Sequence, residues 1–186
     1  TKNSFKLTGM NIVAHRGFWT RPNEQNSISA VHAALRKNCS VEIDVRDADG
    51  RAVLSHDPAL ASAEVFNAET LLNSSAKNLL LFIDVKSAGL QPLLGEWLPS
   101  FKNQMIVFGS SITELMHYEK CGFRYLVRFS EHEKPIPSVR TFGAFGRGLD
   151  VFASDWFSDD EMSVWLEKYP VVLGVAAELR GRYPRI

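Results

Sequence analysis

The chain has 186 residues, of which 45% are hydrophobic and 23% are charged, as is typical of a single globular domain. Lysine plus arginine number 21, as do aspartate plus glutamate, so the net charge is zero and favours neither nucleic acid nor an acidic membrane surface as a partner. The apolar runs are far shorter than the ~20 residues that a membrane-spanning helix needs. We therefore expect residues 10–186 to form one domain with a sizeable core.

The first residues and the cysteines predict a cytoplasmic location. Residues 1–9 are polar and lack the apolar segment of a signal peptide, so we interpret them as a leader, with a removed signal peptide as the open alternative. Cys39 and Cys121 belong to no CxxC motif, and the simplest interpretation is two reduced thiols. The sequence does not predict the oligomeric state.

Short runs rich in Val, Ile, Leu and Phe recur along the chain and predict eight β-strands. Most of these runs show little alternation between apolar and polar residues, which is typical of strands buried on both faces, as in a parallel sheet. The predicted strands are 11–14, 41–45, 52–55, 79–85, 104–108, 125–129, 151–154 and 171–175.

Helical patterns separate most of these strands. Residues 27–37 carry apolar side chains at helical spacing after a polar start, and 90–98, 111–120 and 159–168 are further predicted helices. Strands that alternate with helices predict a (β/α)8 barrel of the TIM type. Since such barrels usually contain ~250 residues, we expect this one to be distorted, with trimmed or missing helices.

The second and third predicted strands form the main exception to the alternating order. The link between residues 45 and 52 is too short for a helical crossover, and Asp49-Gly50 within it is a hairpin signal. We therefore predict an antiparallel hairpin at this point of the barrel. If Gly50 is the centre of a three-residue loop, Asp44 lies opposite His56.

Ionisable residues follow the first two predicted strands. His15 and Arg16 come directly after the first strand, and Glu42 and Asp44 lie two residues apart on the second, so they share one face. Two carboxylates on a buried face need a compensating charge, and a ligand set of oxygen atoms favours Mg²⁺ or Ca²⁺ over Zn²⁺. The alternative interpretation is an edge strand with a solvated acidic face.

The later strands end in residues of complementary chemistry. His56 follows the third strand, and the fourth ends in Asp84, a candidate third ligand, and in Lys86. Because the carboxyl ends of parallel strands meet at one barrel mouth, these groups could supply the acid, the base and the charge neutralisation that phosphodiester cleavage needs. Arg128 is a candidate for substrate contact or a plain strand-end charge. Trp156 is a candidate for stacking on a sugar or glycerol, or a core residue.

The chain resembles the glycerophosphodiester phosphodiesterase family from residue 10 to about residue 87, and its later part resembles short members of that family. The matching motifs are His15-Arg16-Gly17, Asn26-Ser27, Glu42-Ile43-Asp44-Val45-Arg46, Asp49-Gly50, His56-Asp57-Pro58 and Asp84-Val85-Lys86. The resemblance implies a distorted (β/α)8 barrel that binds a divalent metal ion and has a role in lipid metabolism. The implied roles are metal binding by Glu42, Asp44 and Asp84, acid–base catalysis by His15 and His56, and phosphate contacts by Arg16 and Lys86.

Some departures from the family pattern leave the substrate open. Asp84 stands where the family has Glu, Gln25-Asn26-Ser27 replaces Glu-Asn-Thr, and the segment between His56 and Asp84 lacks the insertion that covers the glycerol end of the substrate. The predicted function is metal-dependent hydrolysis of a small-molecule phosphodiester. The alternatives are a larger phosphate-linked glycan or lipid headgroup as substrate, a metal-free phospholipase C-like barrel, and a non-catalytic phosphate-binding barrel.

Overall fold

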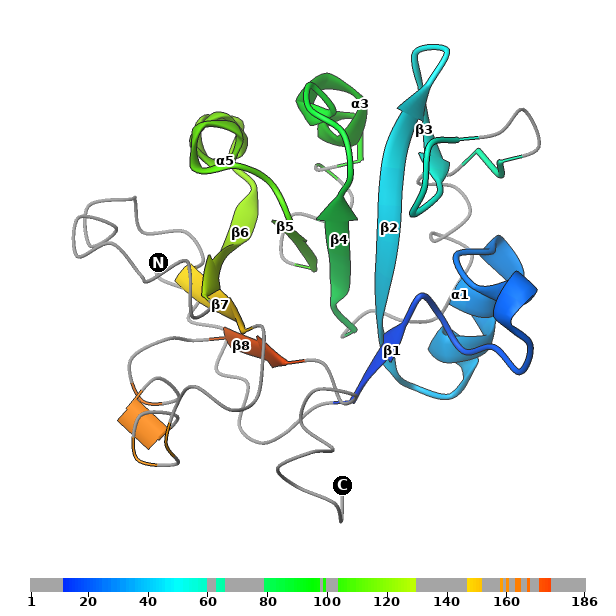
Figure 1. The fold of residues 1–186 in the computed structure, drawn as a ribbon, viewed down its shortest axis with the longest axis horizontal. Helices are drawn as coiled ribbons and strands as arrows, with labels where there is room; N and C mark the ends of the chain where they lie inside the picture. Colours follow the sequence, from blue (N-terminus) through cyan, green and yellow to red (C-terminus); the bar gives the residue numbers. More distant parts are fainter. Residues whose placement is uncertain are drawn as a thin grey trace.

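The computed structural model describes residues 12–59, 63–65, 79–97, 99, 104–129, 147–151 and 171–174, together with residues 158, 160, 163, 164 and 167. Eight strands within these ranges form one curled sheet (Figure 1). The strands are β1 (Val13–His15), β2 (Ser40–Ala48), β3 (Arg51–Leu54), β4 (Leu81–Val85), β5 (Met105–Phe108), β6 (Arg124–Phe129), β7 (Arg147–Val151) and β8 (Val171–Gly174). The helices are α1 (Ile28–Arg36), α3 (Gln91–Gly95) and α5 (Ile112–Lys120), preceded by one 3₁₀ turn, η1 (Pro22–Glu24).

The strand order confirms the predicted fold class. The sheet runs β1-β2-β4-β5-β6-β7-β8 with parallel neighbours throughout, and β3 pairs with β2 away from this path in the antiparallel direction. A curled sheet of this kind is a half-barrel, which corresponds to a distorted barrel of the TIM type. It contains the predicted antiparallel hairpin at β2–β3. None of the described helices has the length and apolar character required to cross a bilayer.

Side-chain caps fix the starts of the two longer helices. Ser27 accepts a hydrogen bond from the Ala30 N–H before α1, and Ser111 accepts one from the Glu114 N–H before α5. Such a cap satisfies a donor that would otherwise have no partner in the first turn. The helices predicted at 27–37 and 111–120 are confirmed. The helix predicted at 90–98 is shorter, since α3 ends at Gly95, and the one predicted at 159–168 lies largely outside the described residues.

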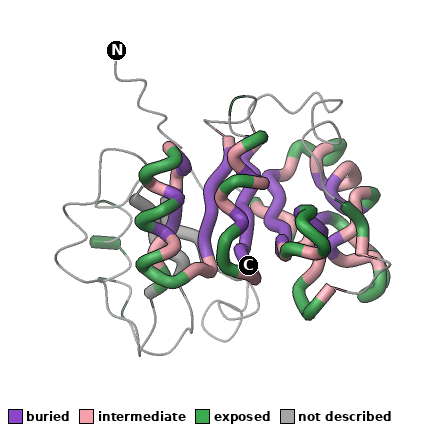
Figure 2. Tube along the Cα trace, turned by 90° about the horizontal axis from the view of Figure 1, so that it is seen from above, coloured by how far each residue is buried: buried purple, intermediate pink, exposed green. Residues whose placement is uncertain are grey.

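The two faces of the sheet carry separate apolar layers. One layer contains Ile43, Ile83 and Val107 and packs against helix residues such as Val31 and Tyr118. The opposite layer consists of Leu80, Phe82, Ile106, Phe108 and Leu126, with Val13 packed against it. Figure 2 shows the buried strands running between helices whose outer sides are exposed. The second layer therefore lines the inner, concave face of the half-barrel.

Ionisable side chains continue this inner layer toward the carboxyl ends of the strands. Alternate residues of a strand share a face, so Asp84 follows Phe82 on the inner face, Arg128 follows Leu126, and His15 follows Val13. The apolar layer closes the bottom of the half-barrel, and the ionisable groups form its mouth.

The register of the β2–β3 hairpin differs from the prediction. Ala48 pairs with Arg51, so the loop has two residues, Asp49 and Gly50, rather than three. Both have positive φ, 50° and 73°, as in the type I′ turn that matches the natural twist of a two-stranded ribbon. Asp44 consequently lies opposite Ser55, whose N–H donates to the Asp44 carbonyl at 3.2 Å. The prediction that Asp44 lies opposite His56 was wrong by one residue.

The seventh strand begins four residues earlier than predicted. β7 starts at Arg147, whereas the apolar pattern indicated 151–154. Gly148 and Asp150 interrupt the apolar run in the part of the strand that pairs with β6. Pairing with its neighbours, rather than composition, makes this segment a strand.

Candidate active site

The register of the parallel strands gathers the three predicted carboxylate ligands. Asp44 of β2 pairs with Asp84 of β4, and Glu42 shares a face with Asp44 two residues earlier. All three residues are buried, and one carboxylate oxygen from each lies within 4.8 Å of the others. The structure thus brings together, on the inner face, groups that are up to 42 residues apart in the chain.

Two cationic side chains lie against these carboxylates. Lys86 Nζ is 2.6 Å from Asp84 Oδ2 and 3.1 Å from Asp44 Oδ1, so the ammonium group bridges two strands. Arg16 Nε lies 2.9 Å from Asp44 Oδ2, but its N–H is not aligned for a hydrogen bond, so this is a charge contact. The Arg16 guanidinium also donates to Gln25 Oε1 at 3.1 Å. Arg16 and Lys86, both predicted to bind phosphate, therefore belong to the carboxylate cluster.

Asn26 is a part of the site that the sequence did not predict. Its Nδ2 donates to Asp44 Oδ2 at 2.6 Å, while its Oδ1 accepts the Asp44 backbone N–H at 3.0 Å. The residue is buried and has a φ of 52°, a left-handed conformation that asparagine tolerates better than most residues. The signal available in the sequence was its place in the Asn26-Ser27 motif, but a polar residue before a helix is usually a cap.

The donor set fits a hard divalent cation. Glu42 Oε2 accepts the Arg16 backbone N–H at 2.9 Å, and both oxygens of Asp44 contact cations or Asn26. Asp84 Oδ1, in contrast, is buried and has no hydrogen-bond partner in the structure. A buried carboxylate oxygen without a partner is costly, and a metal ion is the partner that its position among two further carboxylates favours.

The two predicted catalytic histidines occupy different surroundings. His15 Nε2 is 3.9 Å from Glu42 Oε2, and the His15 carbonyl accepts the Trp19 indole N–H at 3.0 Å. His56 Nδ1 is 2.9 Å from Asp57 Oδ1, and the Arg46 side chain donates to the His56 carbonyl at 3.0 Å. Both rings are about half exposed, at 56% and 45%. The structure therefore places His15 against the carboxylates, while the contacts of His56 are with Asp57 and Arg46.

Comparison with known proteins gives matches at the level of structure. No protein-family model and no curated protein sequence matches the chain. A glycerophosphodiester phosphodiesterase from Agrobacterium tumefaciens strain C58 superimposes with a TM-score of 0.67 at 15% identity, covering 89% of this chain and 85% of that one. An Oleispira antarctica phosphodiesterase, solved with its product sn-glycerol-3-phosphate, gives 0.63 at 16% identity, covering 89% and 84%. This chain has the glycerophosphodiester phosphodiesterase fold.

Burial at the mouth of this phosphodiesterase fold changes the acidity of the cluster. Burial, together with the charge of Asp44, raises the pKa of Glu42 to about 8, and burial also raises the pKa of Asp84. Burial lowers the pKa of His15, and the Arg16 charge adds to this effect. Burial alone would lower the pKa of Lys86, but its hydrogen bond to Asp84 and the charges of Asp84 and Asp44 outweigh that effect and raise it. Glu42 is therefore largely protonated at pH 7, and its ionisation would add a negative charge beside Asp44 and Asp84.

We expect binding of Mg²⁺ or Ca²⁺ at pH 7 to release about one proton, because the ion needs the ionised carboxylate of Glu42. The affinity should rise with pH up to about 8, the pKa of that group. In EDTA, where no metal ion is bound, stability should change with pH in the opposite direction to metal affinity. The folded-state pKa of Glu42 lies above the ordinary 4.5, so the contribution of this group to the free energy of unfolding should fall as pH rises from 4.5 to about 8. Calorimetric titration in two buffers of different ionisation enthalpy measures the released proton, and Glu42→Gln should abolish the release. Binding that is independent of pH between 6 and 8 would contradict this assignment.

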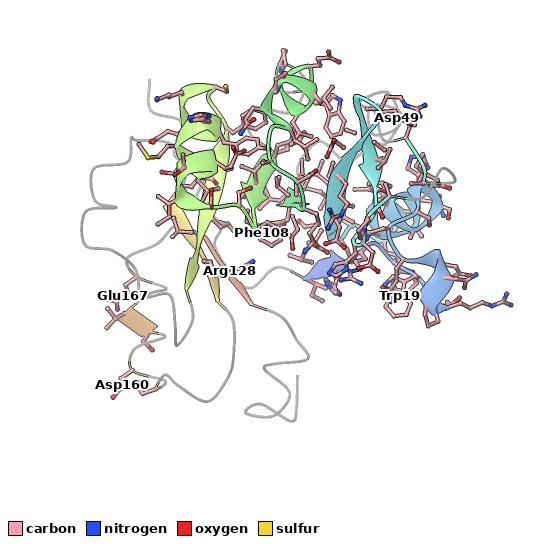
Figure 3. All side chains as sticks on the ribbon, turned by 45° about the horizontal axis from the view of Figure 1, so that its top comes forward. Trp19, Asp49, Phe108, Arg128, Asp160 and Glu167 are labelled. Atoms are coloured by element: carbon pink, nitrogen blue, oxygen red, sulfur yellow. The ribbon has the colours of Figure 1, made fainter. Side chains whose placement is uncertain are left out.

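Of the remaining predicted site residues, the structure describes Arg128. Arg128, at the end of β6, has its charge close enough to oppose the rise in the pKa of Asp84. Figure 3 shows this side chain beyond the end of β5, where Phe108 is labelled. The substrate contact predicted for Arg128 is thus compatible with its place. Trp156 lies outside the described residues.

Proposed function

We propose that this chain is a metal-dependent phosphoric diester hydrolase of the glycerophosphodiester phosphodiesterase type. The observation that carries the proposal is the buried trio of Glu42, Asp44 and Asp84, whose oxygens lie within 4.8 Å of one another beside His15, Arg16 and Lys86. The shared fold supports it, since two phosphodiesterases place their chains in the same arrangement. The substrate class we propose is a glycerophosphodiester, because sn-glycerol-3-phosphate is the product bound in one of these relatives.

Glu42, Asp44 and Asp84 would hold one divalent cation, either Mg²⁺ or Ca²⁺. When bound, such an ion supplies Lewis-acid polarisation of a non-bridging phosphate oxygen and a template for the phosphodiester. Arg16 can hold phosphate oxygens through its guanidinium N–H groups, and Lys86 adds a positive charge next to them. These two side chains already lie at the carboxylates, so a phosphate beside the ion would be within their reach.

The two histidines would move the protons. Burial lowers the pKa of His15, so its imidazole is neutral at pH 7 and able to accept a proton from the attacking water or substrate hydroxyl. His56 would donate a proton to the leaving alkoxide. Its Nδ1 lies against the Asp57 carboxylate, which leaves Nε2 for the leaving group. We therefore assign His15 as the base and His56 as the acid.

The chain's partner would be a small molecule. Two free cysteines, Cys39 and Cys121, agree with the reducing cytoplasm that we propose as its location. A phosphate-linked glycan or a lipid headgroup remains the alternative substrate class, which a substrate screen would separate from simple glycerophosphodiesters.

Hydrolysis of bis(p-nitrophenyl) phosphate and of glycerophosphodiesters, each with EDTA and with added Mg²⁺ or Ca²⁺, tests this function. We expect cleavage that disappears in EDTA and returns with a divalent ion. Cleavage that persists in EDTA would instead favour the metal-free phospholipase C-like chemistry. Absence of cleavage with either ion, combined with an unchanged melting temperature on metal addition, would favour a phosphate-binding protein.

A further inference from the structure

Gly109 follows β5 at the point where the inner face meets the carboxylate cluster. Phe108, the residue before it, pairs with Asp84 of the neighbouring strand β4. Gly109 has a φ of 77°, and a Cβ on this residue would lie 1.9 Å from Asp84 Oδ1 and 3.0 Å from Asp84 Cγ. An atom at that distance from the carboxylate oxygen is sterically forbidden, so the Asp84 carboxylate occupies the volume that any other residue at position 109 would fill.

The same carboxylate is held from its other side. Lys86 donates to Asp84 Oδ2 at 2.6 Å, while Oδ1, the oxygen against Gly109, is buried and accepts no hydrogen bond in the structure. Aspartate has only two side-chain torsions, so Oδ1 cannot retreat from a new methyl group without turning the whole carboxylate. Turning it would separate the carboxylate from Lys86 and change its distance to Glu42 and Asp44.

We propose that Gly109 is a positioning residue, whose missing side chain lets Asp84 present Oδ1 to the ion held with Glu42 and Asp44. This inference rests on the proposed function, because it concerns the third ligand of the same site. For the fold, an alanine at position 109 would add backbone strain at a positive φ and would displace the end of one side chain. It would be a large loss for the site, since that displaced group is the metal ligand. If Gly109 served only the backbone, its replacement by alanine would lower stability without a specific loss of metal affinity.

The matched control is Gly89, which has nearly the same φ. Its φ is 81°, and a Cβ there would meet no atom within 4 Å. Gly89→Ala and Gly109→Ala therefore share the strain of an alanine in a left-handed conformation. Only Gly109→Ala adds the collision with Asp84. A difference between the two variants in metal affinity isolates the contact with the carboxylate.

The experiment measures the melting temperature in EDTA and the dissociation constant of Mg²⁺ and Ca²⁺ by calorimetric titration. We expect both alanine variants to lose melting temperature in EDTA through backbone strain, and Gly109→Ala to lose somewhat more, because the collision also disturbs the Lys86–Asp84 pair. Gly109→Ala should weaken metal binding by at least about tenfold, the scale seen when a residue that orients a ligand is removed, while Gly89→Ala should stay within about twofold of the wild type. In an Asp84→Ala background, Gly109→Ala should have no further effect on metal affinity, because the colliding carboxylate is gone.

Two results would overturn the inference in distinguishable ways. In the first, the wild-type chain binds metal and Gly109→Ala binds it equally well, or the effects of Gly109→Ala and Asp84→Ala on metal affinity simply add. Gly109 then does not position the ligand, and the proposed function stands. If the wild-type chain binds neither ion and cleaves no phosphodiester, the proposed function fails and this inference fails with it.

Discussion

Replacing Asp44 with asparagine is expected to lower metal-dependent phosphodiester hydrolysis by at least about a thousandfold, which corresponds to about 4 kcal/mol of transition-state stabilisation. The carboxylate is 1% exposed and lies at the centre of the cluster, where Arg16, Lys86 and Asn26 all contact it. Asparagine has the same shape but carries no charge and only one acceptor oxygen. It therefore removes the charged metal ligand while the strand keeps its packing.

The loss should appear in metal binding as well as in turnover. Calorimetric titration of Asp44→Asn should detect no binding of Mg²⁺ or Ca²⁺ at concentrations that saturate the wild type. The change also leaves Lys86 and Arg16 with less compensation, so some loss of thermal stability is expected, since removing one partner of a buried ion pair is destabilising.

Asp47→Asn is the matched control for this change. Asp47 is on the same strand, three residues later, but its side chain is exposed and it belongs to no metal-binding cluster in the described part of the chain. The substitution should leave rate, affinity and stability within about twofold of the wild type. Near-normal hydrolysis by Asp44→Asn would remove the basis of the proposed metal site.

Replacing His56 with alanine should lower the rate of hydrolysis about a hundredfold to ten-thousandfold, the range expected for the loss of a general acid. Metal affinity should change by less than about twofold, because the ring contacts Asp57 and its backbone carbonyl contacts Arg46, and neither residue is a proposed ligand. His56 is a cleaner test than His15, whose ring lies 3.9 Å from Glu42. The measurement is a pair of assays, steady-state hydrolysis and calorimetric metal titration.

A leaving-group series sharpens the result. A substrate whose leaving group is p-nitrophenolate needs little protonation, so His56→Ala should reduce its cleavage much less than that of an alkyl glycerophosphodiester. The control is His117→Ala, on the exposed side of α5, which should leave the cleavage rates of both substrates unchanged. Equal losses for both substrates would argue against an acid role for His56, and near-normal rates for both would exclude a catalytic role altogether.

Local patterns in the sequence were enough to predict most of the described elements and the general chemistry of the site. Continuous apolar runs predicted strands buried on both faces, and the polar start before α1 predicted where that helix begins. The two-residue spacing of Glu42 and Asp44 predicted that they share a face. These patterns follow from the period of a strand or helix and from the needs of a helix terminus, so neighbouring residues suffice to determine them. The roles of the two histidines, the identity of the metal and the contribution of Trp156 stay predictions.

Only the tertiary structure decided which groups meet. The pairing of Asp44 with Asp84 depends on the register between two strands that lie 40 residues apart in the chain, and the hairpin register depends on the left-handed conformation of Asp49. Gly109 showed no signal in the sequence, and Asn26 showed only its place in the Asn26-Ser27 motif. Their importance comes from a missing Cβ and a buried hydrogen bond, each beside a distant residue. The sequence determined that this is a barrel-like α/β chain with acidic and basic residues at its strand ends. Contacts between distant segments, which no local period encodes, determined how those residues form a site.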